Sequence, residues 1–263
     1  MKIGYQGTIG SFSQIAAKNL FKDGELVNYL LFKEVLKSVA LDEVSYGVLP
    51  IENSYTGEVG MVLDELFNEN VYITSMYDLP ITQNLIGLKG ANLENIKQVY
   101  SHEQALMQCS EFLNSINVEL IPYANTALAS EFIKKANDPT KAAIASSLTA
   151  ELFDLKILKE EINNNCTNTT RFAVISKEIK EIKSNFAFMF TVKDGSGALA
   201  KVLNEISKLN VNLTSITSRS THNLPWKYYF YCEAEGRLDS TNIKKLITVL
   251  NEKCEIFKIV GSY

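Results

Sequence analysis

Polar and glycine residues gather at the ends of several strands predicted within the first 176 residues of this sequence. In open α/β sheets, ligands bind beyond the carboxyl ends of the strands, where helix N-termini point. Any one of these segments is typical of helix capping by Ser, Thr or Asn. Together they predict a pocket of hydroxyls, amides and free backbone N–H groups. They span residues 4–13, 50–57, 101–104, 125–126 and 168–171.

Arg171 is the residue of this set that indicates the charge of a ligand. A planar guanidinium suits bidentate capture of a carboxylate, although an ordinary surface salt bridge explains a single arginine equally well. The whole chain is acidic, with a formal charge of −4, so it lacks the basic balance typical of nucleic-acid binding. Attraction to an anion would therefore be local, from helix N-termini and single arginines. These residues predict a cleft for a small anion.

Other kinds of chemistry have little support in the residues. Gly4, Gly7 and Gly10 are spaced by threes and do not form the dinucleotide motif GxGxxG, and no P-loop lysine follows them. His102 could be a catalytic base, but no nucleophile elbow accompanies it. The four cysteines are scattered without a CxxC pair, and the sequence has two histidines, so a metal site is poorly supplied. We expect no metal and no cofactor.

Alternating strand-like and helix-like stretches must position the polar segments. Such βα units predict a largely parallel sheet with helices on its faces. The segments at 78–80 and 158–165 could be crossing points between two lobes. The predicted strands cover residues 3–5, 47–49, 71–76, 99–100, 119–123 and 142–145.

A linker rich in lysine and glutamate, at 177–184, separates this region from a second unit. Helical spacing recurs there at 199–209 and 243–250, and a loop is predicted at 222–225. The order β-α-β-β-α-β predicts a ferredoxin-like fold. The four predicted strands cover residues 185–192, 211–218, 226–232 and 255–260.

The N-terminus leads directly into a predicted strand, without an apolar signal segment before it. No apolar run reaches the roughly 20 residues that a bilayer span needs. Scattered cysteines are typical of reduced thiols inside cells. The sequence therefore predicts a cytoplasmic protein that binds neither membranes nor nucleic acid.

Four sequence blocks resemble the signatures of prephenate dehydratases. The Pro-Ile-Glu-Asn-Ser and Thr-Arg-Phe blocks, in this order, are specific, and the resemblance covers essentially the whole chain. The C-terminal unit resembles the ACT domain that these enzymes carry. The four blocks are residues 4–17, 49–54, 101–109 and 168–172, and the ACT-like segments are 197–199 and 212–219 with Trp226, Tyr228 and Phe230.

Two positions depart from the family pattern. Glu103 stands where these enzymes usually have proline, within the block around His102. In the ACT-like unit, the usual Glu-Ser-Arg-Pro is replaced by Thr-Ser-Arg-Ser at 217–220. No chorismate mutase segment precedes Met1, so the resemblance predicts the monofunctional form.

The resemblance implies an α/β catalytic domain of two lobes, similar to type 2 periplasmic binding proteins, with the active site between the lobes. The catalytic domain would cover residues 1–178, with lobe 1 at about 1–77 and 160–178 and lobe 2 at about 78–159. An α+β ferredoxin-like ACT domain would cover residues 185–263.

The implied function is that of a lyase in L-phenylalanine biosynthesis, which converts prephenate to phenylpyruvate, water and carbon dioxide without a cofactor. L-Phenylalanine would be the feedback effector, bound between the ACT domains of two subunits of a homodimer or homotetramer. Two alternatives remain. One is an arogenate dehydratase, whose substrate carries an amine in place of the ketone, and the other is a non-catalytic amino-acid-binding regulator.

The resemblance also assigns roles to residues. Thr170 is expected to donate a hydrogen bond to the departing hydroxyl, because a threonine is too weak an acid to release a full proton. Arg171 is expected to hold the keto-acid carboxylate, or only to order residues 52–54. The expected catalytic residues are Thr170, Ser101, Gln108, Glu52 and Asn53; the substrate-binding ones are Arg171, Ser54, Thr126, Ser11 and Phe172; and the effector-binding ones are Gly197, Ala198, Leu199, Asn212, Leu213, Thr214, Ser218 and Arg219.

Overall fold

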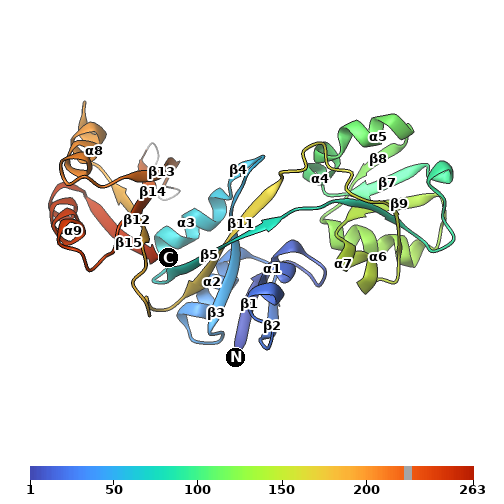
Figure 1. Cartoon of the computed structure of the whole chain (residues 1–263), viewed down its shortest axis with the longest axis horizontal. Coiled ribbons are helices and arrows are strands. Elements are labelled where there is room, and N and C mark those ends of the chain that lie inside the picture. The colour runs from blue at the N-terminus through green and yellow to red at the C-terminus, as the bar shows by residue number, and fades with distance from the viewer. Residues whose placement is uncertain (222–226) are drawn as a thin grey trace.

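The computed structural model describes residues 1–221 and 227–263. The loop predicted at 222–225 and Trp226, expected in the second effector segment, lie outside the described residues. Three bodies lie in a row in Figure 1, with the C-terminal domain at the left, lobe 1 in the middle and lobe 2 at the right. Two long strands run from lobe 1 towards lobe 2.

Lobe 1 is built on strands that flank β3 and carry helices on both faces. These strands belong to a ten-stranded sheet in the order β13-β14-β12-β15-β5-β11-β3-β1-β2, with β4 on β3. The elements of lobe 1 are β1 (Lys2–Gln6), α1 (Phe12–Leu20), β2 (Glu25–Tyr29), α2 (Phe32–Ala40), β3 (Tyr46–Asn53), β4 (Gly57–Glu58), α3 (Gly60–Asn68), β5 (Tyr72–Pro80) and β11 (Thr169–Ser176).

Lobe 2 has its own five-stranded sheet, in the order β10-β6-β9-β7-β8. Separate apolar clusters, with Leu85 and Val99 in one and Ile86 and Ile133 in the other, form its core. Its elements are β6 (Asn84–Gly87), η1 (Leu93–Asn95), β7 (Gln98–Ser101), α4 (Glu103–Gln108), α5 (Ser110–Ile116), β8 (Glu119–Pro122), α6 (Thr126–Ala136), β9 (Lys141–Ala145), α7 (Ser147–Leu152) and β10 (Lys156–Lys159).

The prediction of a largely parallel sheet is wrong, because both sheets are mixed. In lobe 1, β1 pairs parallel to β2 and β3, but β11 runs antiparallel to both β3 and β5. In lobe 2, β7 is parallel to its neighbours, and β6 is antiparallel to β9 and β10. A parallel pair usually needs a helical crossover on the face of its own sheet. Strands β5 and β11 are joined through lobe 2 instead, so the returning strand runs in the opposite direction.

Two neighbouring segments, at 81–83 and 160–168, connect the lobes. The Ile81 N–H donates to the Asn168 carbonyl at 2.8 Å, and the Gln83 N–H donates to Asn163 Oδ1 at 2.7 Å. Asn163 Nδ2 donates back to the Ile81 carbonyl at 3.0 Å. These bonds tie the two connections together, close to the crossing points expected at 78–80 and 158–165.

The C-terminal domain has the predicted order β-α-β-β-α-β. Phe186, Phe188 and Phe190 on its first strand pack against the two helices, whereas Ala187 and Met189 between them face lobe 1. This alternation follows from the period of two in a strand, which buries opposite faces against different partners. The elements are β12 (Asn185–Thr191), α8 (Ala198–Lys208), β13 (Leu213–Ser220), β14 (Tyr228–Glu235), α9 (Thr241–Lys253) and β15 (Ile256–Ser262).

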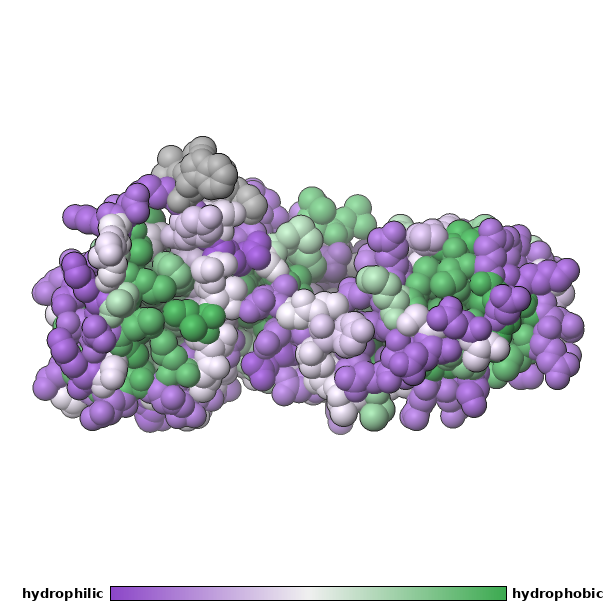
Figure 2. Space-filling view, turned by 90° about the horizontal axis from the view of Figure 1, so that it is seen from above, coloured by the Kyte–Doolittle hydropathy of each residue, from purple (hydrophilic) through white to green (hydrophobic). Residues whose placement is uncertain are grey.

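Hydrophobic side chains gather on the surface of the C-terminal domain, at the left of Figure 2, and of lobe 2, at its right. Within residues 1–221 and 227–263, no helix is both long and apolar enough to cross a bilayer.

Lys258 fastens the C-terminal domain to the end of α3. Its ammonium donates to the Leu66 carbonyl at 2.8 Å and to the carbonyls of Phe67 and Glu69. These carbonyls lie at the negative end of the helix, where a cation is favoured. Burial nevertheless lowers the pKa of Lys258 to about 8.

We expect Lys258→Met to remove a pH dependence from the free energy of unfolding. Between about pH 8 and the ordinary lysine pKa of 10.5, the unfolded chain keeps the proton on Lys258 while the folded protein has released it. In this window the unfolded state binds more protons than the folded state. The free energy of unfolding of the parent should therefore rise with pH, compared with that of the variant. Chemical denaturation of both proteins below, within and above the window measures this difference. Parallel curves for the two proteins would contradict it.

Candidate active site

A cavity of about 440 Å³ lies between the two lobes. Residues from all five predicted polar segments line it, although these segments come from both lobes. It is lined by Gln6, Ser11, Phe12, Ser13, Phe32, Pro50, Asn53, Thr56, Val59, Met61, Ile81, Gln83, His102, Gln104, Ala105, Gln108, Asn125, Thr126, Thr170 and Phe172.

The described lining of this cavity contains no Asp, Glu, Lys or Arg side chain. Three of the lining residues cap a helix N-terminus with their side chains: Ser11 accepts from the Gln14 N–H, His102 from the Gln104 N–H and Asn125 from the Leu128 N–H. The N-termini of α1, α4 and α6 therefore border the cavity. Helix N-termini carry partial positive charge and unpaired N–H groups, so neutral residues provide the attraction for an anion.

Thr170 is held in the cavity by Asn53. The two residues are paired across β11 and β3, and Asn53 Nδ2 donates to Thr170 Oγ1 at 2.9 Å. The same amide donates to Asn168 Oδ1 at 2.8 Å, and its oxygen accepts from the Tyr55 and Thr56 N–H groups. Because Asn53 acts as the donor, the hydroxyl proton of Thr170 is free to donate in another direction. The chemical result is a fixed, neutral hydrogen-bond donor.

Two buried glutamines add amide groups to the lining. Gln108 is 7% exposed and Gln83 is 3% exposed, and no described residue makes a hydrogen bond to either side-chain amide. Gln83 Oε1 is fully buried without a partner. A buried polar group without a partner is costly, which favours a bound ligand or water at this position. Gln83 was missed from the sequence, although it lies three residues after the crossing point predicted at 78–80.

Ser101 and Ser54 were expected in the site but do not line the cavity. Ser101 is fully buried, and its hydroxyl donates to the Ile144 carbonyl at 2.9 Å, which ties β7 to β9. Ser54 Oγ accepts from the Thr169 N–H at 3.0 Å. Both hydroxyls therefore fix backbone segments that carry lining residues. Gln108, Asn53, Thr126, Ser11 and Phe172 do lie on the cavity with Thr170.

Arg171 and Glu52 lie on the opposite face of the sheet from the cavity. Arg171 follows Thr170 on β11, and Glu52 precedes Asn53 on β3. Thr170 is paired with Asn53 across the two strands, and Arg171 with Glu52. Successive residues of a strand point to opposite faces. Because Thr170 and Asn53 face the cavity, the neighbouring pair must face away from it. Arg171, expected to hold a substrate carboxylate or to order residues 52–54, does not line the cavity in this structure, and its guanidinium lies 3.3 Å from Glu52 Oε2. Burial opposes the charge of Arg171, but Glu233, Asp78 and Glu52 outweigh it and raise the pKa of the guanidinium.

The lobes touch at the rim of the cavity. Gln104 Nε2 donates to Thr56 Oγ1 at 3.0 Å, and Thr149 Oγ1 donates to the Gly10 carbonyl at 2.8 Å. Gly10 has φ of +90°, a conformation that a residue with a Cβ atom would strain to adopt. The glycine-rich loop at 4–13 therefore forms a contact between lobes.

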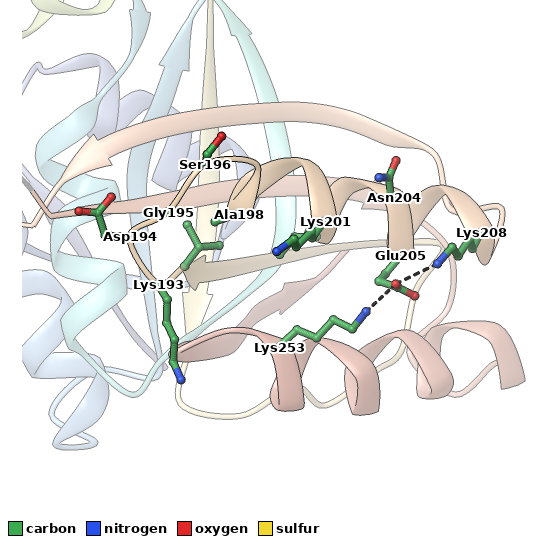
Figure 3. Close-up of a pocket in the computed structure, with 12 residues that line it drawn as sticks. Lys193, Asp194, Gly195, Ser196, Ala198, Lys201, Asn204, Glu205, Lys208 and Lys253 are labelled. Carbon is green, nitrogen blue, oxygen red and sulfur yellow. Dashed lines mark hydrogen bonds and ion pairs between the residues drawn. The ribbon is translucent and has the colours of Figure 1, made fainter.

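A second cavity, of about 510 Å³, lies beside the N-terminus of α8 (Figure 3). Of the first expected effector segment, 197–199, only Ala198 lines it, together with Gly195 and Ser196 just before the segment. Gly197 is the N-cap of the helix with φ of +76°. Asn212, Leu213 and Thr214 do not line it. At its far end, Glu205 accepts from Lys208 at 3.1 Å and from Lys253 at 2.6 Å.

Arg219, which was expected to bind the effector, faces lobe 1. Its Nε and Nη2 donate to Asp64 Oδ1 and Oδ2 at 2.8 and 2.7 Å, and Tyr229 donates to the same carboxylate at 2.6 Å. Ser218, the neighbour of Arg219 on β13, is exposed. The Arg219 guanidinium thus joins two domains in this structure.

The chain is similar to known proteins over almost its whole length. Residues 3–180 match the family Prephenate dehydratase, and residues 187–251 match the ACT domain. A prephenate dehydratase of Lactococcus lactis is 31% identical over 277 residues, which cover 100% of this chain and 97% of the relative. A chloroplastic arogenate dehydratase/prephenate dehydratase of Arabidopsis thaliana is 30% identical over 281 residues, which cover 100% of this chain and 72% of the relative.

Solved structures resemble the chain over its full length. The prephenate dehydratase of Staphylococcus aureus has a TM-score of 0.86 at 28% identity, with 100% of both chains covered. The prephenate dehydratase of Arthrobacter aurescens in complex with L-Phe has a TM-score of 0.92 at 23% identity, with 100% of this chain and 90% of that chain covered. These likenesses confirm the predicted two-lobed α/β fold followed by a ferredoxin-like domain.

Proposed function

The chain belongs to the prephenate dehydratase family, and we propose that its interlobe cavity converts prephenate to phenylpyruvate, carbon dioxide and water, as a step in L-phenylalanine biosynthesis. The observation that carries this proposal is the Thr170 hydroxyl, which accepts from Asn53 at 2.9 Å and so directs its own proton elsewhere. Among the described residues, the lining around it contains no Asp, Glu, Lys or Arg and is bordered by helix N-termini. The family is a lyase family, and this chain is an enzyme of that kind.

The reaction needs help for one bond in particular. The ring carboxylate leaves as carbon dioxide, and the electron pair of the broken C–C bond enters the ring. The C–O bond to the ring hydroxyl then breaks, and hydroxide departs and takes a proton to become water. Formation of the aromatic ring makes this sequence favourable, so the poor leaving group limits the rate. A hydrogen bond from Thr170 to the departing oxygen stabilises the charge that develops there.

A lining without Lys or Arg suits this chemistry. A cation held against the ring carboxylate would stabilise the ground state and oppose loss of carbon dioxide, whereas catalysis requires stronger binding of the transition state. Helix N-termini with neutral amides and hydroxyls can bind the dianion without placing a full charge at that carboxylate. We assign substrate binding to Ser11, Thr126, Gln108 and Gln83, all of which line the cavity.

We expect the purified protein to release phenylpyruvate from prephenate. The matched assay supplies arogenate and follows phenylalanine, because the two substrates differ in a ketone and an amine and the Arabidopsis relative is described by both activities. Faster turnover of arogenate would favour the alternative of an arogenate dehydratase. A folded protein that turns over neither substrate would favour a non-catalytic regulator and contradict the proposal.

L-Phenylalanine is the proposed effector of the C-terminal domain. The match to the ACT domain supports this, and the Arthrobacter aurescens relative is described as a complex with L-Phe. The segment at 197–199 begins α8, and a helix N-terminus suits an amino-acid carboxylate. Addition of L-phenylalanine to the prephenate assay should lower the rate, and a rate insensitive to the amino acid would remove this part of the proposal.

Three further properties belong to the proposal. The catalytic domain would end near residue 178 and the ACT domain would begin near residue 185, on either side of the irregular segment at 177–184. The protein would form a homodimer or homotetramer, which the hydrophobic surface of the C-terminal domain in Figure 2 supports. Its location would be the cytoplasm. Four free cysteines support a reducing compartment.

A further inference from the structure

Thr170 and Arg171 are consecutive residues that face different parts of the molecule. Thr170 lines the cavity, and Arg171 points to the other face of the sheet. Each also contacts β3, through Asn53 for Thr170 and through Glu52 for Arg171. A displacement of the backbone at Arg171 would therefore have to pass through only one peptide unit to reach the proposed catalytic residue.

Arg171 lies among three carboxylates from three different strands. Its Nε is 3.2 Å from Asp78 on β5, and its Nη1 is 3.3 Å from Glu52 on β3 and 3.7 Å from Glu233 on β14. The Asp78 and Glu52 side chains are 61% and 44% exposed, whereas that of Glu233 is 9% exposed. Exposed ion pairs contribute little, but a buried carboxylate depends on its cationic partner. The contact with Glu233 is thus the one with the greatest consequence.

Glu233 is held within the C-terminal domain. The Tyr231 hydroxyl donates to its Oε1 at 2.8 Å, and β14 is paired on both sides, with β12 and with β13. Burial first, and then Glu233, raise the pKa of Tyr231, so its hydroxyl remains a donor. The position of Glu233 therefore follows the position of the C-terminal sheet as a whole.

We propose that Arg171 is a positioning residue, which links the C-terminal domain through Glu233 to the strand that carries Thr170. It does not bind the substrate. A shift of the C-terminal domain, such as an effector would produce, would move Glu233 and with it the Arg171–Thr170 backbone. The inference rests on the proposed function for its kinetic consequences, and on geometry alone for the link between the domains.

The decisive variant is Glu233→Gln, which removes the charge from the buried partner and keeps its size. With prephenate as substrate, we expect kcat to fall about tenfold and KM to stay close to the parent value, because misplacement of a catalytic group slows the chemical step. The matched control is Asp78→Asn, which removes a closer but exposed carboxylate from the same guanidinium, and we expect its kinetics to resemble those of the parent. Inhibition by L-phenylalanine should weaken in Glu233→Gln and persist in Asp78→Asn.

Arg171→Gln and the double variant with Glu233→Gln complete a double-mutant cycle. Glu233→Gln should lower kcat much less when Arg171→Gln is already present than it does in the parent. If Arg171→Gln instead raises KM strongly and leaves kcat intact, the guanidinium binds substrate and the proposal is wrong. Equal kinetics for Glu233→Gln and the parent would also overturn it.

Amide hydrogen exchange separates this inference from the proposed function, because it needs no turnover. We expect the amides of β11 to exchange faster in Glu233→Gln than in Asp78→Asn and the parent. An inactive parent with this pattern would contradict the proposed function while supporting the link between the domains. An active parent with the same β11 exchange in both variants would contradict the link alone.

Discussion

Thr170→Val is expected to lower kcat by roughly 10²–10³, the usual cost of losing one donor to a developing oxyanion, with little change in KM. Valine has nearly the shape of threonine, so the substitution removes the hydroxyl without opening a cavity. In the parent, Asn53 Nδ2 donates to Thr170 Oγ1 at 2.9 Å, which leaves the hydroxyl proton available for the leaving group. Steady-state kinetics with prephenate measure both constants.

Thr169→Val is the matched control for this experiment. Thr169 precedes Thr170 on β11 but does not line the cavity, and its hydroxyl donates to the Thr167 carbonyl at 3.1 Å. We expect its kcat to remain near that of the parent. A Thr170→Val enzyme that changes in KM alone would show that the hydroxyl binds the ground state as well as the transition state, and the proposed role would be wrong.

Arg219→Met is expected to reduce the free energy of unfolding by about 3 kcal/mol, near the lower end of the cost of breaking a buried ion pair. The Asp64 side chain is 11% exposed and that of Arg219 is 28% exposed, so removal of the guanidinium leaves Asp64 largely buried without its bidentate partner. The contact is tight. A Cβ atom on Gly60 would lie 1.9 Å from Arg219 Nη1, so α3 begins with a residue that leaves space for the guanidinium.

Chemical denaturation measures this loss, and Arg237→Met is its matched control. Arg237 also pairs bidentately with an aspartate, Asp239, but both side chains are exposed. Exposed pairs contribute little, so we expect Arg237→Met to unfold nearly as the parent does. The contrary result is an Arg219→Met protein that unfolds like the parent and loses only its response to L-phenylalanine. That result would show that Arg219 binds the effector and that its pairing with Asp64 does not stabilise the fold.

The two proposed interdomain contacts have different consequences. The contact of Arg219 with Asp64 joins β13 to α3, which carries the lining residue Met61 but not Thr170. The contact of Arg171 with Glu233 joins β14 to the residue beside Thr170. Loss of the first should therefore lower stability, and loss of the second should lower kcat. Measurement of both properties for both variants distinguishes attachment of the domain from transmission to the cavity.

Local patterns in the sequence were sufficient for much of the fold. The C-terminal order β-α-β-β-α-β followed from the period of two in β12 and the helical spacing in α8 and α9. The polar segments at the strand ends do line one cavity, as predicted. Helix caps such as Ser11 and Asn125 lie where strands end and helices begin, which is a pattern that the sequence displays. Family resemblance, carried by short blocks, supplied the chemistry expected of Thr170.

Tertiary structure decided which side chains face the cavity. The alternation of Thr170 with Arg171, and of Asn53 with Glu52, was visible in the sequence, since neighbours on a strand must face opposite sides. Which side holds the cavity depends on where α1, α3 and the C-terminal domain pack, and no local pattern specifies that. For this reason no local pattern decided whether Thr170 or Arg171 would face the cavity.

Long-range contacts likewise required the assembled domains. Asp64 and Arg219 are separated by 155 positions, and Lys258 caps a helix that ends at Asn68. The antiparallel return of β11 also depends on the route of the chain through lobe 2. Sequence alone determined which elements form and which residues could do chemistry, because these depend on neighbours in the chain. Only the folded molecule determined the partners of charged groups, because burial against another domain decides which charges must pair.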